Sequence, residues 1–150
     1  MSTPPNLELF NETVGKTFAF LYENFPVERS ISLEKLLELK CLKIGSADFE
    51  EAEKKRDICY YSIKWLIDAG YISAEPRPYS GFADAVLTVR GVELLKIRPK
   101  ALSDTFGDSL LKLSKSGIMG GVKNSLSGLT STMLTAGATI SYHMAMVHHS

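Results

Sequence analysis

The sequence predicts a mainly α-helical domain with one small β-hairpin, an α+β fold. Apolar residues recur at helical spacing through most of residues 7–70, and the period changes to two over residues 71–89. Gly91 then precedes a further helical segment, which Pro99 ends. The 150 residues are 45% hydrophobic and 23% charged, as in globular proteins. This composition excludes a largely disordered, collagen-like or disulfide-stapled chain.

Three helices are expected before the hairpin. The first covers residues 7–25, where apolar residues follow each other at steps of three and four, and Pro26 stops it. Ser32 is suited to cap a short second helix. The third helix begins at Asp48, which has the spacing of a capping box, and runs to about Ala69.

The hairpin is expected to have two short strands and a long loop. Residues 71–74 form the first strand and residues 85–89 the returning strand. The ten residues between them, from Glu75 to Asp84, include two prolines and a glycine, and we assign them to a loop. A fourth helix follows Gly91.

Two motifs flank this hairpin. Residues 63–72, Ile-Lys-Trp-Leu-Ile-Asp-Ala-Gly-Tyr-Ile, place a glycine where a helix passes into a strand. Residues 87–95 follow the pattern Leu-Thr-x-x-Gly-x-x-Leu-Leu. In this order the motifs resemble the winged helix-turn-helix superfamily over residues 7–98. The resemblance implies a winged helix followed by C-terminal helices, with the third helix in the DNA major groove and the hairpin, or wing, on the backbone or minor groove.

The resemblance also implies which residues contact nucleic acid. Three lie on the third helix, two at the wing tip and two just after the wing: Tyr60, Tyr61, Lys64, Arg77, Tyr79, Arg90 and Lys96. Against this, the first ten residues of the third helix carry five acids and three bases, a balance that repels phosphate although it suits a helix N-terminus. The aromatic residues, Trp65 included, have a second interpretation, which is packing against an adjacent helix or a second subunit.

We divide the chain into a winged-helix domain, residues 1–100, and a C-terminal amphipathic helical extension, residues 101–150. The extension begins near Gly107-Asp108-Ser109-Leu110, an arrangement that resembles small bacterial winged-helix proteins. Its apolar stripe needs a surface to cover it. The candidate oligomerisation residues are Phe106, Leu110, Leu113, Leu126, Leu129 and Met133. The alternatives to a second copy are the body of the domain, another protein or a lipid surface; many Ser and Thr residues make a transmembrane span too polar.

The charge is balanced overall but not along the chain. Lys plus Arg and Asp plus Glu number 17 each, yet residues 1–75 carry a net charge of −4 and residues 76–150 one of +4. We therefore expect an anionic partner to bind through the second half of the chain, residues 76–150.

No enzyme chemistry is expected. All three histidines fall in the last eight residues, and Cys41 and Cys59 have apolar neighbours typical of core cysteines. Val14-Gly15-Lys16-Thr17 ends like a P-loop but lacks the glycine five positions before Gly15. We therefore expect no catalytic residue, metal or cofactor. Unpaired cysteines and the absence of a signal-peptide pattern favour the cytoplasm.

Two functions remain at this point. The first is a dimeric winged-helix protein that binds double-stranded DNA, a bacterial transcription regulator or a mobile-element-associated protein. The second is a winged-helix protein-interaction module that does not bind DNA, in which the C-terminal region docks on a partner or a membrane surface.

Overall fold

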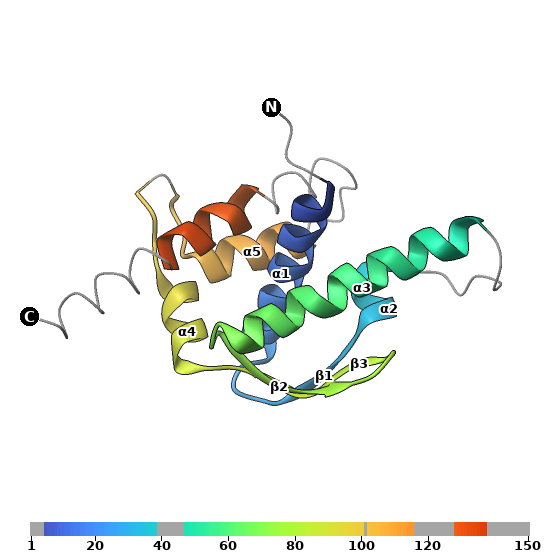
Figure 1. Ribbon diagram of the computed structural model, residues 1–150. Helices are drawn as coiled ribbons and strands as arrows, with labels where there is room; N and C mark the ends of the chain where they lie inside the picture. Colours follow the sequence, from blue (N-terminus) through green and yellow to red (C-terminus); the bar gives the residue numbers. More distant parts are fainter. Residues whose placement is uncertain (1–4, 39–46, 101, 116–127, 138–150) are drawn as a thin grey trace, which may run out of the picture.

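The computed structural model describes residues 5–38, 47–100, 102–115 and 128–137. These residues form a mainly helical protein with one small antiparallel sheet, which confirms the predicted α+β class (Figure 1). The elements in chain order are α1 (Pro5–Asn24), β1 (Arg29–Ser32), α2 (Leu33–Leu37), α3 (Ala47–Asp68), β2 (Ile72–Arg77), β3 (Gly81–Leu87), α4 (Val89–Lys96) and α5 (Phe106–Lys115). A further helix covers residues 128–137.

The long helices lie close to their predicted positions. α1 and α3 each begin and end within two residues of the expected bounds, because both have a periodic apolar face and a clear C-terminal stop. Ser32 caps α2 as expected, and its side chain accepts a hydrogen bond from the Lys35 backbone N–H at 3.4 Å. Thr88 caps α4 in the same way, through the Gly91 N–H at 3.2 Å.

The sheet has one strand more than predicted. β1 pairs antiparallel with β3, so the strand order is β1-β3-β2. Its four residues contain a single apolar side chain, Ile31, which is buried opposite Phe82 of β3. One apolar residue is too weak a pattern to predict a strand, and pairing with β3 decides the conformation.

The predicted ten-residue wing loop is wrong. β2 continues to Arg77 and β3 begins at Gly81, so only residues 78–80 connect the strands. Pro76 fits within β2 because this strand lies at the edge of the sheet, where a residue without an N–H is tolerated. Val89, expected at the end of the returning strand, opens α4 instead.

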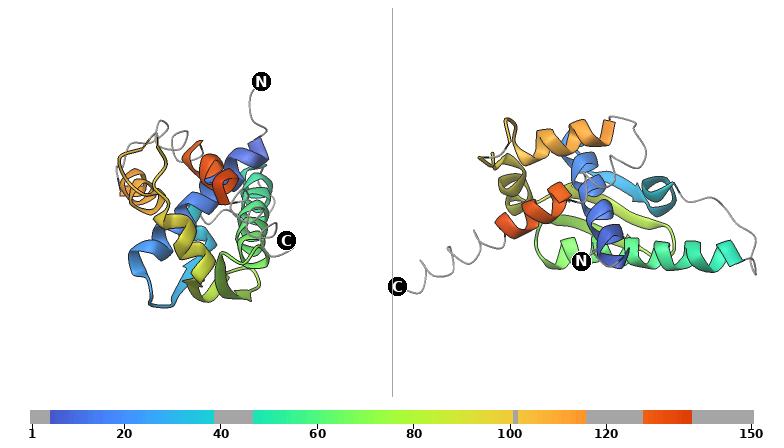
Figure 2. Two further views of the ribbon diagram at one scale, coloured as in Figure 1. Left: turned by 90° about the vertical axis from the view of Figure 1, so that its left-hand side faces the viewer. Right: turned by 90° about the horizontal axis from the view of Figure 1, so that it is seen from above.

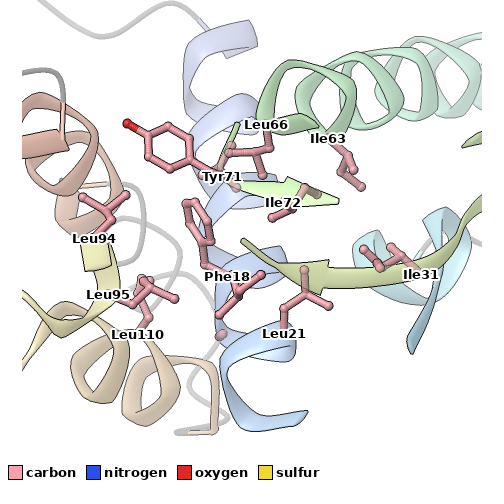
Figure 3. Close-up of a cluster of buried hydrophobic side chains, with 14 of the residues drawn as sticks. Phe18, Leu21, Ile31, Ile63, Leu66, Tyr71, Ile72, Leu94, Leu95 and Leu110 are labelled. Atoms are coloured by element: carbon pink, nitrogen blue, oxygen red, sulfur yellow. The ribbon is translucent and has the colours of Figure 1, made fainter. Parts of the chain in front are cut away.

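One hydrophobic core connects all the layers. α1 lies between α3 on one side and α5 on the other, with the sheet below them (Figures 1 and 2). Phe18 of α1 is completely buried, with Leu66 of α3 above it and Leu95 and Leu110 of α4 and α5 to its side (Figure 3). The α3 side chains that face this core therefore fix which face of α3 remains exposed.

Candidate nucleic-acid interface

α3 exposes part of the face that was expected to contact DNA. Tyr61 is 62% exposed and Lys64 is exposed as well. Tyr60 is not on that face: it is half-buried, and its ring stacks on Phe82 of β3 with centroids 5.1 Å apart. Adjacent helical residues point about 100° apart, so Tyr60 and Tyr61 cannot share one face. Tyr61 meets Tyr60 edge-on at 5.4 Å, which connects the exposed face of α3 to the hairpin.

Trp65 packs against the adjacent helix, one of the two arrangements expected for it. Its ring meets Phe10 of α1 edge-on, with centroids 5.3 Å apart. The indole nevertheless remains 45% exposed. Trp65 therefore contributes both to the α1–α3 contact and to the exposed surface beside Tyr61.

The hairpin tip carries the two predicted wing residues. Tyr79 is 85% exposed and has a positive φ of 66°, which allows the three-residue connection between the strands. Arg77 is exposed, and its Nη1 lies 3.4 Å from a carboxylate oxygen of Glu75 on the same strand. The Glu75 carboxylate offsets much of the charge that Arg77 would present to a phosphate.

The two basic residues after the wing lie at the other end of the hairpin. The seven residues of β3 separate the tip from α4, a distance of roughly 23 Å at the usual rise of a strand. Arg90 stacks on the Tyr71 ring, with its guanidinium carbon 4.7 Å from the centroid. Lys96 is exposed at the end of α4. The structure thus brings Tyr61 and Lys64 together but distributes Arg77, Tyr79, Arg90 and Lys96 over both ends of the hairpin.

Several charges at the start of α3 are neutralised within the chain. Glu51 pairs with Lys55 at 3.9 Å, and Arg56 lies 3.7 Å from Glu53 and 3.0 Å from Glu34 of α2. Arg56 therefore joins α3 to α2 and is turned away from the exposed face.

Six other charged residues of α3 are exposed without an ion pair in the part of the chain that the structure describes: Asp48, Glu50, Lys54, Asp57, Lys64 and Asp68. All but Lys64 were missing from the predicted site. Glu50, Lys54, Asp57 and Asp68 are spaced from Tyr61 and Lys64 at steps of three and four, a sequence signal that would have placed these residues on one face.

The predicted oligomerisation residues are mostly covered by the chain itself. Phe106, Leu110 and Met133 are buried in the core. Leu113 and Leu129 are partly buried and pack against it. Leu126 lies outside the described residues. Contact of these residues with a second copy stays a prediction, whereas packing on the body, an alternative raised by the sequence, is observed for five of the six.

The described cysteine has the environment of a core residue. Cys59 is completely buried, and burial raises the pKa of its thiol to about 12. A thiol with this pKa stays protonated at neutral pH and is a poor nucleophile or metal ligand. Within the described ranges, no three His, Cys, Asp or Glu side chains are grouped so as to hold a metal ion; Cys41 and the three histidines lie outside those ranges.

Among the helices of the described residues, none has both the length and the apolar character needed to cross a bilayer. The chain was also compared with protein-family models, curated proteins and solved structures, and it matches none of them.

Proposed function

We propose that the chain is a winged-helix protein that binds double-stranded DNA through α3 and the β2–β3 hairpin, and that it acts in the cytoplasm as a regulator of transcription. The order helix, strand, helix, helix, hairpin supports the fold part of this proposal. β1 adds to it, because a strand between the first two helices pairs beside the hairpin and anchors the wing to the domain. Fold alone does not assign function, so the DNA-binding part of the proposal has to be argued from the site.

The observation that carries the proposal is the aromatic connection between α3 and the wing. Tyr61 contacts Tyr60, and Tyr60 stacks on Phe82. Phe82 and its neighbour Gly81 pair with Pro76 and Arg77 at the tip of the hairpin. These ring contacts support the proposal because they link Tyr61 of α3 to the strand pair at the hairpin tip, and a reader helix and a wing must be fixed relative to each other to straddle a duplex.

Titration of random duplex DNA at several salt concentrations tests this proposal. The variant Lys64→Ala/Arg77→Ala removes one cation from α3 and one from the tip. We expect weaker binding to every sequence, and a slope of log affinity against log salt that is about two units shallower, because two phosphate contacts are lost.

Lys55→Ala/Lys112→Ala is the matched control for that experiment. Both lysines are exposed, and the change in net charge is identical, but neither residue lies at the hairpin tip or on the side of α3 that carries Tyr61 and Lys64. The control is expected to bind like the unchanged protein. Equal losses in both variants would mean that only net charge matters and would contradict the docking geometry.

A second function, a protein-interaction module, is favoured by the charge of the same face. Glu50, Asp57 and Asp68 outnumber Lys54 and Lys64 by one, so the exposed face of α3 has no excess of positive charge, and it carries two large aromatic rings. Exposed aromatic residues are typical of protein interfaces, and a face without net positive charge does not attract phosphate. Absence of duplex binding even at low salt would favour this function over the first.

A further inference from the structure

A single stripe of exposed residues runs along α3. Its members are Glu50, Lys54, Asp57, Tyr61, Lys64 and Asp68, at successive steps of four, three, four, three and four. This spacing keeps them on one side of a helix and is the spacing of a helix–helix seam. α3 lies along one side of the molecule, with no other described element beyond it (Figure 2, right).

The charges of this stripe differ from four of the five charges elsewhere on α3. Glu51, Lys55, Glu53 and Arg56 form ion pairs within the chain. The five charges of the stripe do not, as far as the described residues extend. The pairing inside the chain thus leaves two positive and three negative side chains on the same side as Tyr61.

Four of the five charges reverse in sign about Tyr61, and the fifth, Glu50, has no counterpart because α3 ends at Asp68. Lys54 lies seven residues before it and Asp68 seven residues after it. Asp57 lies four residues before it and Lys64 three residues after it. When two such helices run antiparallel with a twofold axis at Tyr61, each positive side chain lies at the level of a negative one on the other copy. Closed twofold symmetry requires a self-complementary surface of this kind.

We propose that a second copy of this chain packs on this face, α3 against α3 in antiparallel orientation, with the two Tyr61 rings at the centre. Lys54 of each copy pairs with Asp68 of the other, and Asp57 with Lys64, so that every pair occurs twice. Trp65, one turn beyond Tyr61, adds apolar area beside the seam. Aromatic residues at the centre with charged residues toward the ends match the anatomy of protein interfaces.

This association does not depend on DNA binding, but it has a consequence for it. Tyr61 and Lys64 would be covered in the dimer, so a duplex and a second copy compete for α3. Self-association would then reduce the fraction of protein able to bind DNA as its concentration rises.

Sedimentation equilibrium of the full chain, without DNA, tests the proposal. Protein concentrations of up to about 1 mM allow a dissociation constant as weak as about 1 mM to be detected. We expect a monomer–dimer equilibrium. Lys54→Asp and Asp68→Lys should each weaken it roughly tenfold, because each places like charges opposite one another at both ends of the seam. The combined variant Lys54→Asp/Asp68→Lys restores opposite charges and should return the dissociation constant to within about threefold of the original.

Glu51→Lys/Lys55→Glu is the matched control. It exchanges a pair on α3 that lies outside the stripe and is already satisfied within the chain, so the dimer should be unaffected. Circular dichroism establishes that each variant is folded. A monomer at all concentrations, or a dimer indifferent to the single reversals, would overturn the proposal, as would a combined variant no better than either single one. None of these outcomes bears on whether the monomer binds DNA.

Discussion

At the scale of single residues, the Leu-Thr-x-x-Gly motif has a structural explanation. The Thr88 hydroxyl accepts a hydrogen bond from the Gly91 N–H at 3.2 Å and donates one to the Gly70 carbonyl at 2.5 Å. Gly91 packs directly on the backbone, because a Cβ there would lie 2.2 Å from the Tyr71 carbonyl oxygen. The motif thus fastens the start of α4 to the end of α3. These contacts explain the motif by the fold, and they do not identify a ligand.

Thr88 allows a direct test of this explanation. Thr88→Ala removes both hydrogen bonds and should lower the free energy of unfolding by about 1–2 kcal/mol, the usual cost of losing an N-cap with a further bond. Thr88→Ser keeps the hydroxyl and should stay within about 0.5 kcal/mol of the original. Urea denaturation of the two variants measures both values. Equal destabilisation by Ala and Ser would indicate that the methyl group, and not the hydroxyl, matters.

Residue-scale reasoning predicted the site less well than it predicted the caps. Tyr61 and Lys64 are exposed as expected, because the apolar residues of α3 fix its inner face. Tyr60, expected on or near the exposed face, is half-buried against Phe82, and Arg90 lies stacked on Tyr71. Both contacts involve residues more than ten positions away along the chain, which a local pattern cannot supply.

At the scale of elements, α5 is fastened to α1 by polar contacts at its surface as well as by its apolar face. Tyr22 donates a hydrogen bond to Asp108 Oδ1 at 2.7 Å, and Lys115 pairs with Glu23 at 2.6 Å. Gly107 permits the close approach, since a Cβ there would lie 2.8 Å from the Tyr22 ring.

The Tyr22–Asp108 hydrogen bond predicts a pH dependence. This bond, with burial, raises the pKa of Tyr22 above its usual 10.0. A raised pKa in the folded state contributes stability that is present below pH 10 and is lost as the pH rises through the folded value. We therefore expect the free energy of unfolding to fall more steeply above pH 10 in the original protein than in Tyr22→Phe, which cannot titrate. Parallel curves in denaturation experiments from pH 8 to pH 11.5 would contradict this.

Element prediction succeeded where the pattern was long and failed where it was short. α1 and α3 follow from many turns of periodic residues, whereas β1 has one apolar side chain and the ends of β2 and β3 contain proline and glycine. The conformation of these short segments is decided by the hydrogen bonds that β3 makes with β1 and β2, which are non-local contacts.

At the scale of the whole molecule, the core crosses the predicted division at residue 100. Phe106 and Leu110 of α5 are buried in the same cluster as Phe18, and Met133 belongs to it too. Tyr71 approaches the helix over residues 128–137 closely, because a Cβ on Gly137 would lie 2.7 Å from the Tyr71 hydroxyl oxygen. Composition changes near residue 100, yet the described segments on either side share one hydrophobic core.

This continuity predicts that residues 1–100 do not fold independently. Burying a Phe or Leu side chain contributes about 1.5–3 kcal/mol. The loss of Phe106 and Leu110 therefore removes a large part of a total stability of about 5–15 kcal/mol. A chain ending at residue 100 should unfold without a cooperative transition, whereas one ending at residue 115 retains α5 and should unfold cooperatively at a lower midpoint than the full chain. Thermal denaturation, monitored by circular dichroism, distinguishes the unfolding of the full chain from that of the two shortened chains. If the chain ending at residue 100 melted like the full chain, residues 1–100 would fold without α5, and the C-terminal helices would be available to a partner.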